Sequence, residues 1–422
     1  PASCTIGLAR ALRRNAADDV RDRFLPPLLD TDYFAAERAS QFLTEVQGGS
    51  DVGANVCEAE PVGDGSYLLT GEKWFCSVAD AQQFLVTARP DAASEGTSGL
   101  GCFVLPRYLD GKPNGFSIRR LKDKLGTRGM ASGEIDLDGA RAWPIGPIEQ
   151  GFRTVVGVVL NTSRWLTAVG SAGSMRRAYV EAAAYAQHRQ AFGQPIAEFP
   201  VVRMTLASMK LTWLGALHAC WALTDLEDRI DADTASTDDV AFHRFLVNAL
   251  KYTASSAASE VARSGIEVLG GNGTIEDFSV MPRLYRDAMV YESWEGTHNV
   301  LCAQVFNDMK RLGLAEVVDS RVRAMLGEVD SPSGAVVLGA LDDAMDSVRA
   351  CLDDPTHGAA HFRAALGELM ACVQAALLVR DGSPAADLFA RTRLNTQYRP
   401  AADPDYLTSV DSVLAGDLDA TG

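Results

Sequence analysis

The residues best suited to acid-base chemistry lie in the stretch Tyr291-Glu292-Ser293-Trp294-Glu295-Gly296-Thr297-His298-Asn299-Val300, where Glu295 stands between a large aromatic residue and a glycine. A carboxylate with an apolar wall is poorly solvated, which raises its pKa toward the range where it accepts a proton near neutral pH. A glycine lets the backbone approach a ligand closely. Taken alone, such a triplet is more often the end of a strand or the cap of a helix, so the choice depends on the rest of the chain. Glu292 is expected on a strand or irregular loop, pointing elsewhere.

The apolar pattern predicts which elements position these residues. From 41 to 146, short alternating runs are separated by turns rich in Gly, Asp and Pro, which predicts a β domain of barrel or sandwich type. We expect strands at 66–70, 83–88 and 102–105, and a hairpin turn at 63–66.

Helical segments are predicted on both sides of this β domain. Residues 1–40 are helix-compatible and broken at Pro26-Pro27, and residues 147–310 have the apolar period of a helical bundle. Residues 311–422 form an additional helical extension, with breaks at Pro355 and Pro384. The predicted fold class is therefore α+β.

Composition excludes several classes of protein. The chain has 422 residues, is 47% hydrophobic and carries a formal net charge of -16, which argues against a general affinity for nucleic acid. No apolar run approaches the length of a membrane span, so none is expected. The eight scattered cysteines predict reduced thiols and a cytoplasmic protein. Because the chain begins at Pro1 without a signal-peptide core, we expect a truncated or processed piece.

A polar, glycine-rich turn enters the β domain at Thr44-Glu45-Val46-Gln47-Gly48-Gly49-Ser50-Asp51. Backbone N–H groups freed by glycines, together with the Thr44 and Ser50 hydroxyls, can hold a pyrophosphate or the edge of a flavin. For an isolated Gly-Gly-Ser sequence, a surface loop without a ligand is the better interpretation.

Further short motifs follow in order along the chain. They are Gly71-Glu72-Lys73-Trp74-Phe75-Cys76-Ser77, Asn161-Thr162-Ser163-Arg164, Arg189-Gln190-Ala191-Phe192-Gly193 and Glu267-Val268-Leu269-Gly270-Gly271-Asn272-Gly273. Each has an ordinary structural explanation: aromatic residues in a core, an arginine on a helix surface, and glycines that end a helix. Their joint occurrence is much more specific than any one of them.

Taken together, these motifs resemble those of the acyl-CoA dehydrogenase family, and most closely its AidB-like, alkylation-response branch. The resemblance runs from Thr44 to Asn299 and implies a β domain between helical domains, with only part of the family's N-terminal helical domain present. It also implies FAD as cofactor, an acyl-CoA thioester as substrate, and a homodimer or homotetramer in which each flavin is completed by a neighbouring subunit.

The resemblance assigns roles to individual residues. Glu295 matches the general base, and Arg164 matches a cation near it. The residues that match cofactor-binding positions are Thr44, Gly49, Ser50, Phe75, Ser77, Arg189, Phe192, Gly270, Gly271, Thr297 and Asn299. Two positions depart from the common pattern, since Glu267 and Asn299 stand where many relatives have Gln.

The implied reaction is α,β-dehydrogenation of an acyl-CoA, in which Glu295 removes the α proton while hydride leaves the β carbon for flavin N5. The electron acceptor, another flavoprotein or O2, stays open, as does an oxidase activity. The alternative is an AidB-like protective flavoprotein that associates with DNA. From Lys310 to Gly422, however, 10 Lys and Arg face 17 Asp and Glu, a net charge of -7, so nucleic-acid binding is not expected. No metal site is predicted, because His357 and His361 have no third ligand nearby in sequence.

Overall fold

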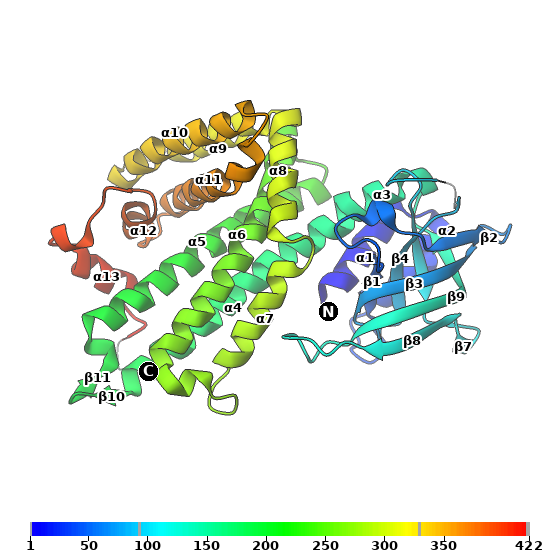
Figure 1. The fold of residues 1–422 in the computed structure, drawn as a ribbon, viewed down its shortest axis with the longest axis horizontal. Coiled ribbons are helices and arrows are strands. Elements are labelled where there is room, and N and C mark those ends of the chain that lie inside the picture. The colour runs from blue at the N-terminus through cyan, green and yellow to red at the C-terminus, as the bar shows by residue number, and fades with distance from the viewer. Residues whose placement is uncertain (1, 92–93, 328–330, 419–422) are drawn as a thin grey trace. The chain divides into compact units, whose positions relative to one another are not determined.

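The computed structural model describes residues 2–91, 94–327 and 331–418, which divide into two compact units (Figure 1). The first unit contains residues 1–166 and the second contains residues 167–422. The division falls within helix α4 (Asn161–His188). The domain boundaries expected near 40, 146 and 310 stay a prediction.

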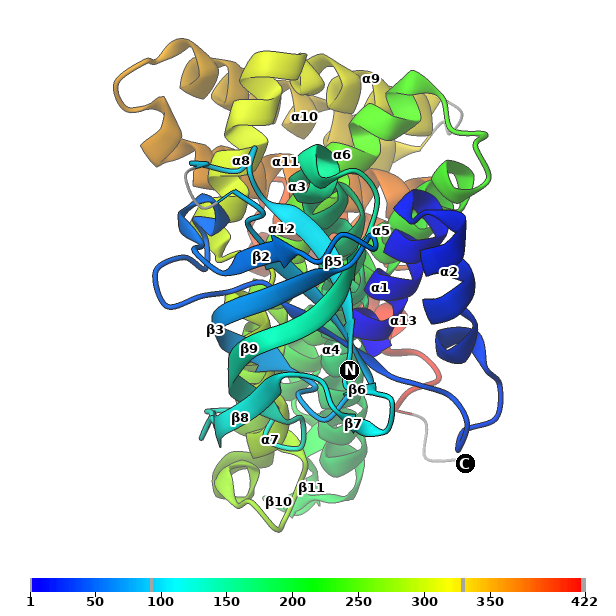
Figure 2. The same ribbon diagram turned by 90° about the vertical axis from the view of Figure 1, so that its right-hand side faces the viewer.

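The first unit is built on a seven-stranded sheet in the order β1-β4-β5-β9-β3-β2, with β8 paired to β9. Pairing is antiparallel except between β1 and β4, which are parallel. The long strand β9 contacts β5, β3 and β8, and so joins the two halves of the sheet, as Figure 2 shows. The strands of the unit are β1 (Ala39–Phe42), β2 (Glu58–Pro61), β3 (Tyr67–Ser77), β4 (Gln83–Ala88), β5 (Gly101–Pro106), β6 (Tyr108–Leu109), β7 (Lys112–Pro113), β8 (Phe116–Leu121) and β9 (Ser132–Pro144).

The predicted strands and hairpin turn are confirmed. Strand β4 has the predicted bounds, β5 contains 102–105, and β3 begins at Tyr67 and continues to Ser77. The turn before β3 contains Gly63 (φ 96°) and Gly65 (φ 84°), a backbone conformation that glycine adopts without steric cost.

The N-terminal helices belong to the core of the β unit. Helices α1 (Ala2–Asn15) and α2 (Asp18–Phe24) and the 3-10 turn η1 (Pro26–Leu29) bury Leu8, Leu12 and Phe24 against strand residues that include Leu85 and Val104. After β9 the chain passes through η3 (Ile148–Gln150), α3 (Gly151–Thr154) and a π-helical segment η4 (Val155–Leu160) before α4 begins.

The second unit is helical. A short hairpin, β10 (Gln190–Ala191) and β11 (Gln194–Pro195), and η5 (Ile196–Glu198) connect α4 to α5 (Pro200–Asp231). A capping box at Ser236 and Asp239 starts α6, because each side chain bonds the other's backbone N–H. The remaining elements of the bundle are α6 (Thr237–Leu269), η6 (Gly270–Thr274), α7 (Met281–Ser293) and α8 (His298–Leu312).

The C-terminal helices share the core of this bundle. Phe362 of α11 packs against Phe306 of α8 with 5.2 Å between ring centroids, and Phe389 of α12 fills the space beside Gly215 of α5. The helices beyond α8 are α9 (Leu314–Gly327), α10 (Pro332–Asp353), α11 (Gly358–Arg380), α12 (Ala386–Arg393) and α13 (Tyr406–Leu414), with η7 (Pro400–Ala402) between the last two. Figure 1 shows α9, α10 and α11 covering one side of α5 and α6.

One expectation about apolar segments needs correction. The expectation that no apolar run has the length of a membrane span is wrong, because helix α11 is long and apolar enough to cross a membrane. In the structure, 67% of its most apolar window is buried, with Leu366, Leu369 and Val373 wholly inside the helical unit. We therefore assign α11 to the core. All eight cysteines are buried and free, as predicted.

Candidate active site

Glu295 lies in the tight turn between α7 and α8. Helix α7 ends at Ser293, and Trp294 is its C-cap in extended conformation. Glu295 (φ 54°) and Gly296 (φ 101°) both have positive φ values. Thr297 follows them as the N-cap residue of α8. Positive φ is costly for a residue with a side chain, so the turn presents the half-buried Glu295 in a conformation that its surroundings must maintain.

The expectation that Glu292 lies on a strand or irregular loop is wrong, because this residue lies in the last turn of α7. Its side chain is also engaged: Ser259 Oγ of α6 donates to Glu292 Oε1 over 2.5 Å. The position of Glu292 on α7 places its side chain on the face toward α6, where Ser259 donates a hydrogen bond to it.

A buried lysine holds the backbone on both sides of Glu295. Lys251 of α6 has no exposed surface, and its Nζ donates to the carbonyl oxygens of Glu292 (3.1 Å) and Gly296 (2.8 Å). The carbonyl groups in the last turn of a helix lack intrahelical partners, and this ammonium group supplies one.

The first turn of α8 is tied to both α6 and α11. His298 is buried, with Nε2 3.2 Å from Ser255 Oγ, while Nη1 of Arg363 donates to Asn299 Oδ1 over 3.2 Å. Nε of the same guanidinium donates to the Tyr252 hydroxyl (3.2 Å). Burial lowers the pKa of His298; the Glu292 carboxylate opposes this effect, and Lys251 and Arg363 add to it.

In the first unit, the predicted cofactor loop is anchored by a buried ion pair. Lys73 Nζ of β3 lies 2.6 Å from Glu45 Oε1, and both side chains are almost fully buried. Glu45 also accepts from the backbone N–H groups of Val56 (2.6 Å) and Cys57 (3.2 Å). The carboxylate therefore joins both ends of the loop that contains Thr44, Gly49 and Ser50, and leaves Gly49 and Ser50 exposed.

The aromatic motif of β3 is partly exposed, as a surface for ring stacking requires. The Phe75 ring is 52% exposed, and Ser77 is half-buried two residues further along. Lys122 Nζ lies 4.4 Å from the centre of the Phe75 ring and 3.6 Å from that of Trp74. The Lys122 ammonium group, just after β8, therefore lies beside the predicted flavin-stacking residue.

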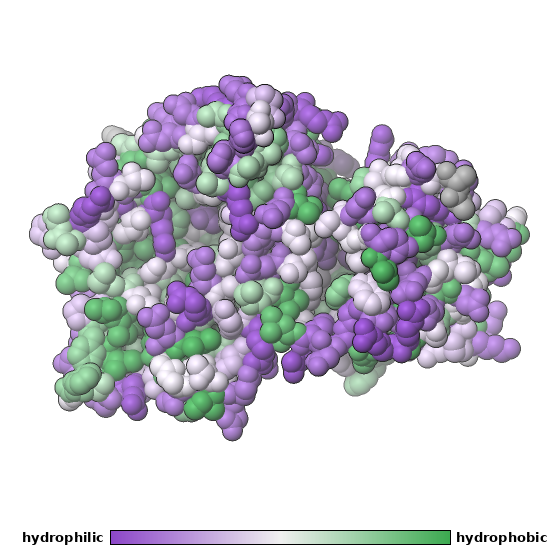
Figure 3. Space-filling view, viewed as in Figure 1, coloured by the Kyte–Doolittle hydropathy of each residue, from purple (hydrophilic) through white to green (hydrophobic). Residues whose placement is uncertain are grey.

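Two other predicted motifs lie together at one end of the helical unit. In the β10–β11 hairpin, Phe192 (φ 52°) is 99% exposed, and Arg189 is also exposed. The exposed Gly270 and Gly271 belong to η6, which Asn272 ties to α4 by donating to the Tyr185 hydroxyl (3.1 Å). Figure 3 shows apolar side chains gathered at the end of the helical unit where Figure 1 places β10 and β11.

The structure thus brings together some predicted residues and separates others. Glu295, Thr297 and Asn299 follow the C-terminal end of α7, whereas Gly270 and Gly271 lie in η6, before its N-terminal end. Helix α7, with 13 residues, is itself about 20 Å long. Arg164 is buried in the first unit, and its predicted proximity to Glu295 of the second unit stays a prediction.

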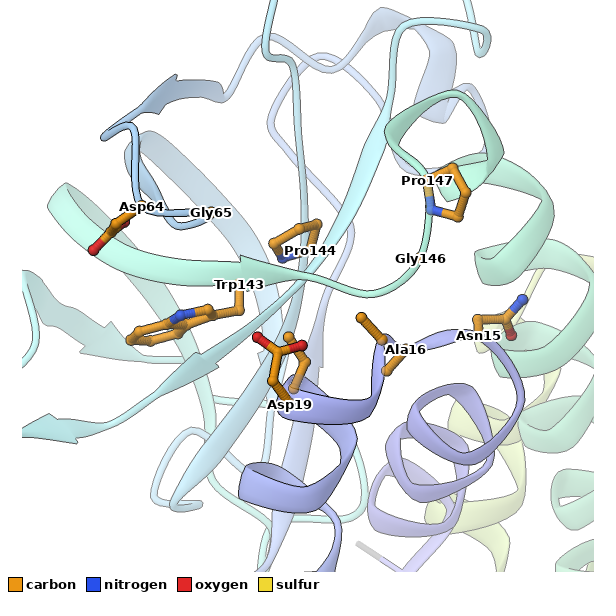
Figure 4. Close-up of a pocket in the computed structure, with 11 residues that line it drawn as sticks. Asn15, Ala16, Asp19, Asp64, Gly65, Trp143, Pro144, Gly146 and Pro147 are labelled. Atoms are coloured by element: carbon orange, nitrogen blue, oxygen red, sulfur yellow. The ribbon is translucent and has the colours of Figure 1, made fainter.

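A cavity of about 490 Å³ in the first unit is distinct from all these residues (Figure 4). It lies between the α1–α2 corner and the end of β9, where the Trp143 indole and the Asp19 carboxylate face it. Its lining includes Asp64 and Gly65 of the predicted hairpin turn, but none of its lining residues in the described part of the chain belongs to a motif assigned to substrate or cofactor. Within the described ranges, no group of three His, Cys, Asp or Glu side chains is placed to hold a metal ion.

Comparison with known proteins decides the family. Residues 40–140 match the middle domain of acyl-CoA dehydrogenases, and residues 149–310 match their C-terminal domain. The chain belongs to the acyl-CoA dehydrogenase family. The α+β fold class that was predicted is confirmed by this membership and by the likeness to solved structures of the family.

The relatives differ in how much of their length the chain covers. AidB of Escherichia coli (strain K12) is 35% identical over 68% of this chain and 51% of its own length. Acyl-CoA dehydrogenase family member 11 of Caenorhabditis elegans is 37% identical over 75% of this chain and 51% of its own length. The crystal structure of Caenorhabditis elegans ACDH-11 in complex with C11-CoA matches this chain with 28% sequence identity and a TM-score of 0.86. The match covers 100% of this chain and 72% of the ACDH-11 chain. The chain thus spans about half the length of these two curated relatives.

Sequence reasoning missed the residues that support the motifs. Glu45 and Lys73 lie within motifs but have no predicted role, and Lys251 and Arg363 belong to no motif. One signal was present in the sequence: Lys251 interrupts the apolar stretch Phe245-Leu246-Val247-Asn248-Ala249-Leu250, and a charged residue in such a stretch needs partners.

Proposed function

We propose that this chain is the catalytic part of an FAD-dependent acyl-CoA dehydrogenase, with Glu295 as the base that removes the α proton. The observation that carries the proposal is the position of Glu295 in a left-handed turn between α7 and α8, at the site of the family's Glu-Gly-Thr motif. A carboxylate held there by a constrained backbone has the fixed position that proton abstraction from a weak carbon acid requires.

The residues present fit FAD. The exposed Phe75 ring and the nearby Ser77 offer a stacking surface and a hydroxyl, and the loop anchored through Glu45 presents Gly49 and Ser50. Thr44 is half-buried at the start of that loop, and its carbonyl accepts from the N–H of Trp74 over 2.8 Å. When bound, the flavin supplies the acceptor for the hydride that leaves the β carbon. The chain's own residues orient the thioester, exclude water from Glu295 and hold the proton on its carboxylate.

We further propose that two subunits complete each flavin site, in a homodimer or homotetramer. Support comes from the separation of the motif residues, because Thr297 and Asn299 lie at one end of α7 and Gly270, Gly271, Arg189 and Phe192 lie at the other. The hairpin that carries the exposed Phe192 also lies where Figure 3 shows apolar side chains gathered, and such a patch is typical of a surface that contacts another molecule. Arg164 is proposed to stand near the Glu295 carboxylate and to moderate its pKa.

The substrate is proposed to be an acyl-CoA, since the ACDH-11 structure contains C11-CoA. The electron acceptor is a flavoprotein or O2. Eight free, buried cysteines favour a reducing, cytoplasmic compartment. The DNA-associated alternative has less support, because the segment from Lys310 to Gly422 carries 10 basic and 17 acidic residues.

The test is anaerobic reduction of the bound flavin by acyl-CoA thioesters of graded chain length. The wild-type chain should purify with FAD and become reduced, whereas Glu295→Gln should retain FAD and lose the reduction rate by about 10²- to 10⁴-fold. Glu316→Gln, the same change at an exposed position of α9, is the matched control. A Glu295→Gln variant that reduces its flavin at the wild-type rate would show that Glu295 is not the base.

A further inference from the structure

Three polar residues form one buried line along α6. Lys251, Ser255 and Ser259 are spaced i, i+4 and i+8, which places them on the same face of the helix, and their exposed fractions are 0%, 0% and 7%. We call them the polar stripe. Such a position in a helical bundle is normally apolar, because burying an ammonium group and two hydroxyls costs free energy unless each finds a partner.

Every member of the polar stripe has its partner in residues 292–298. Lys251 donates to the carbonyl oxygens of Glu292 and Gly296, Ser255 lies in hydrogen-bond contact with His298, and Ser259 donates to the Glu292 side chain. The contacts therefore reach the end of α7, the turn itself and the start of α8. Glu295 is in the middle of the segment that they enclose.

From this arrangement we propose that the polar stripe is the positioning device that fixes the Glu295 carboxylate for proton abstraction. The proposal rests on the proposed role of Glu295 as the base. Lys251, Ser255 and Ser259 act through the backbone and side chains of 292–298 and are positioning residues, since none of them is proposed to touch substrate or flavin.

The backbone of the turn explains why such a device is needed. Glu295 has φ 54°, a conformation that L-residues adopt rarely, and Gly296 at φ 101° adds no side-chain restraint. Left to its own preferences, this segment would populate other conformations and move the carboxylate. The Lys251 contacts with the carbonyl groups of Glu292 and Gly296 fix the two ends of the five-residue segment that contains Glu295.

The two serines fix the flanking side chains. Ser255 Oγ donates to the Lys251 carbonyl over 2.7 Å, so it receives the hydrogen bond from His298 as an acceptor. This assigns the proton of the neutral imidazole to Nε2 and leaves Nδ1 as an acceptor facing Arg363 Nη2 at 3.5 Å. Ser259 holds Glu292, the last acidic side chain before the turn, on the side of α6.

The cost of this arrangement favours a functional role over mere packing. A methionine or leucine at position 251 would fill a buried helix face without the desolvation of an ammonium group. The ammonium contributes what an apolar side chain lacks, namely two directed hydrogen bonds on either side of the reacting residue. A catalytic group displaced by about 1 Å can lose about 100-fold in rate, so a device that fixes Glu295 has a direct kinetic effect.

The test uses the purified FAD-bound protein and the variants Lys251→Met, Ser259→Ala and Ser259→Thr. Ser264→Ala is the matched control, because Ser264 lies on the same helix and bonds only the Glu260 carbonyl over 3.0 Å. Two readouts are taken: hydrogen exchange of the backbone amides 292–298, and the anaerobic rate of flavin reduction at saturating acyl-CoA together with the acyl-CoA dissociation constant.

We expect faster exchange in 292–298 for Lys251→Met and Ser259→Ala, with reduction slowed by up to about 100-fold and the dissociation constant and FAD content unchanged. Ser259→Thr, which restores the hydroxyl, should recover most of the rate. If Lys251→Met does not fold, the two Ser259 variants decide the matter.

Two negative results are distinguishable. A wild-type protein that no acyl-CoA reduces would overturn the proposed function and, with it, this proposal. The second result is a wild-type protein whose flavin is reduced by acyl-CoA, with Ser259→Ala and Lys251→Met variants that react at the same rate and show unchanged amide exchange. This result would overturn the present proposal alone. Equal losses of rate and of acyl-CoA affinity would also contradict it, because a misplaced base affects the chemical step and not binding.

Discussion

Replacing Lys73 by methionine should destabilise the first unit more than any exposed substitution. Lys73 Nζ contacts Glu45 Oε1 (2.6 Å), the Thr87 carbonyl (2.7 Å) and the Thr87 hydroxyl (3.3 Å), with no exposed surface on the lysine side chain. Methionine fills a similar volume, so the change removes the charge and its hydrogen bonds and leaves packing nearly intact.

The size of the expected stability loss follows from the contacts that Glu45 keeps after Lys73 is replaced. Glu45 keeps the N–H groups of Val56 and Cys57 as donors but becomes a buried carboxylate without a counter-charge. Removing one partner of a buried ion pair lowers the free energy of unfolding by about 3–5 kcal/mol. For a unit of about 150–250 residues, each kcal/mol lowers the melting temperature by about 2–4 °C, so a decrease of about 6–20 °C is expected.

Scanning calorimetry of the purified chain measures this change. The melting temperature of the transition in which the first unit unfolds should decrease, whereas that of the transition in which the second unit unfolds should not change. A double-mutant cycle with Glu45→Gln isolates the interaction: the double variant should lose less than the sum of the two single losses, because neither charge is left alone. Arg38→Met, which removes an exposed partner of Asp80 at 3.1 Å, is the control. A Lys73→Met protein that melts within about 2 °C of the wild type would refute the reasoning.

Three further predictions concern other parts of the chain. Burial lowers the pKa of His298 below its ordinary value near 6.5, so the neutral imidazole stabilises the fold above that pH. This stability should be lost as the pH falls below 6.5 toward the folded-state pKa. Denaturant unfolding at several pH values should show the loss in the wild type and a smaller loss in His298→Gln. Phe192→Ser should weaken FAD binding, measured by flavin fluorescence, and leave the melting temperature of the FAD-free chain unchanged, since a ring that is 99% exposed has little packing to lose; unchanged FAD affinity would remove Phe192 from the cofactor site. DNA should not bind at physiological salt, given the net charge of -16, and a salt-sensitive mobility shift at micromolar protein would contradict this and favour the AidB-like alternative.

Much of the fold was predictable because burial imposes a period on the sequence. The apolar run 83–88 became β4 with the predicted bounds, and in the predicted helical extension Leu366, Leu369, Val373 and Leu377 of α11, which recur every three or four positions, are all buried. Periodicity does not show which elements share a core. The N-terminal helices pack inside the β unit, and β1 pairs in parallel with β4, because contacts between distant segments decide both.

The candidate site was predictable where a motif carries its chemistry in adjacent residues. Glu295 and the exposed Phe75 and Phe192 could be named in this way, although their roles toward substrate and flavin stay predictions. Residues that act across the fold could not be named: Lys251 is 44 positions before Glu295, and Arg363 is 64 positions after Asn299. Glu292 was misplaced because helix α7 continues two residues beyond Tyr291, and a helix end is set by its capping contacts and not by its composition.

The shared core of the second unit has a consequence for how this family can change in evolution. Helices of the C-terminal region cover α5, α6 and α8 with apolar contacts such as Phe306 with Phe362 and Gly215 with Phe389. A lineage that gained or lost these helices had to alter the faces of α5, α6 and α8 that they cover at the same time, because the same helix faces are apolar when covered and must be polar when exposed. Arg363 extends this dependence to Asn299, just beyond the turn that contains Glu295. The C-terminal helices and the bundle beneath them are therefore expected to have diverged together, as one inherited unit.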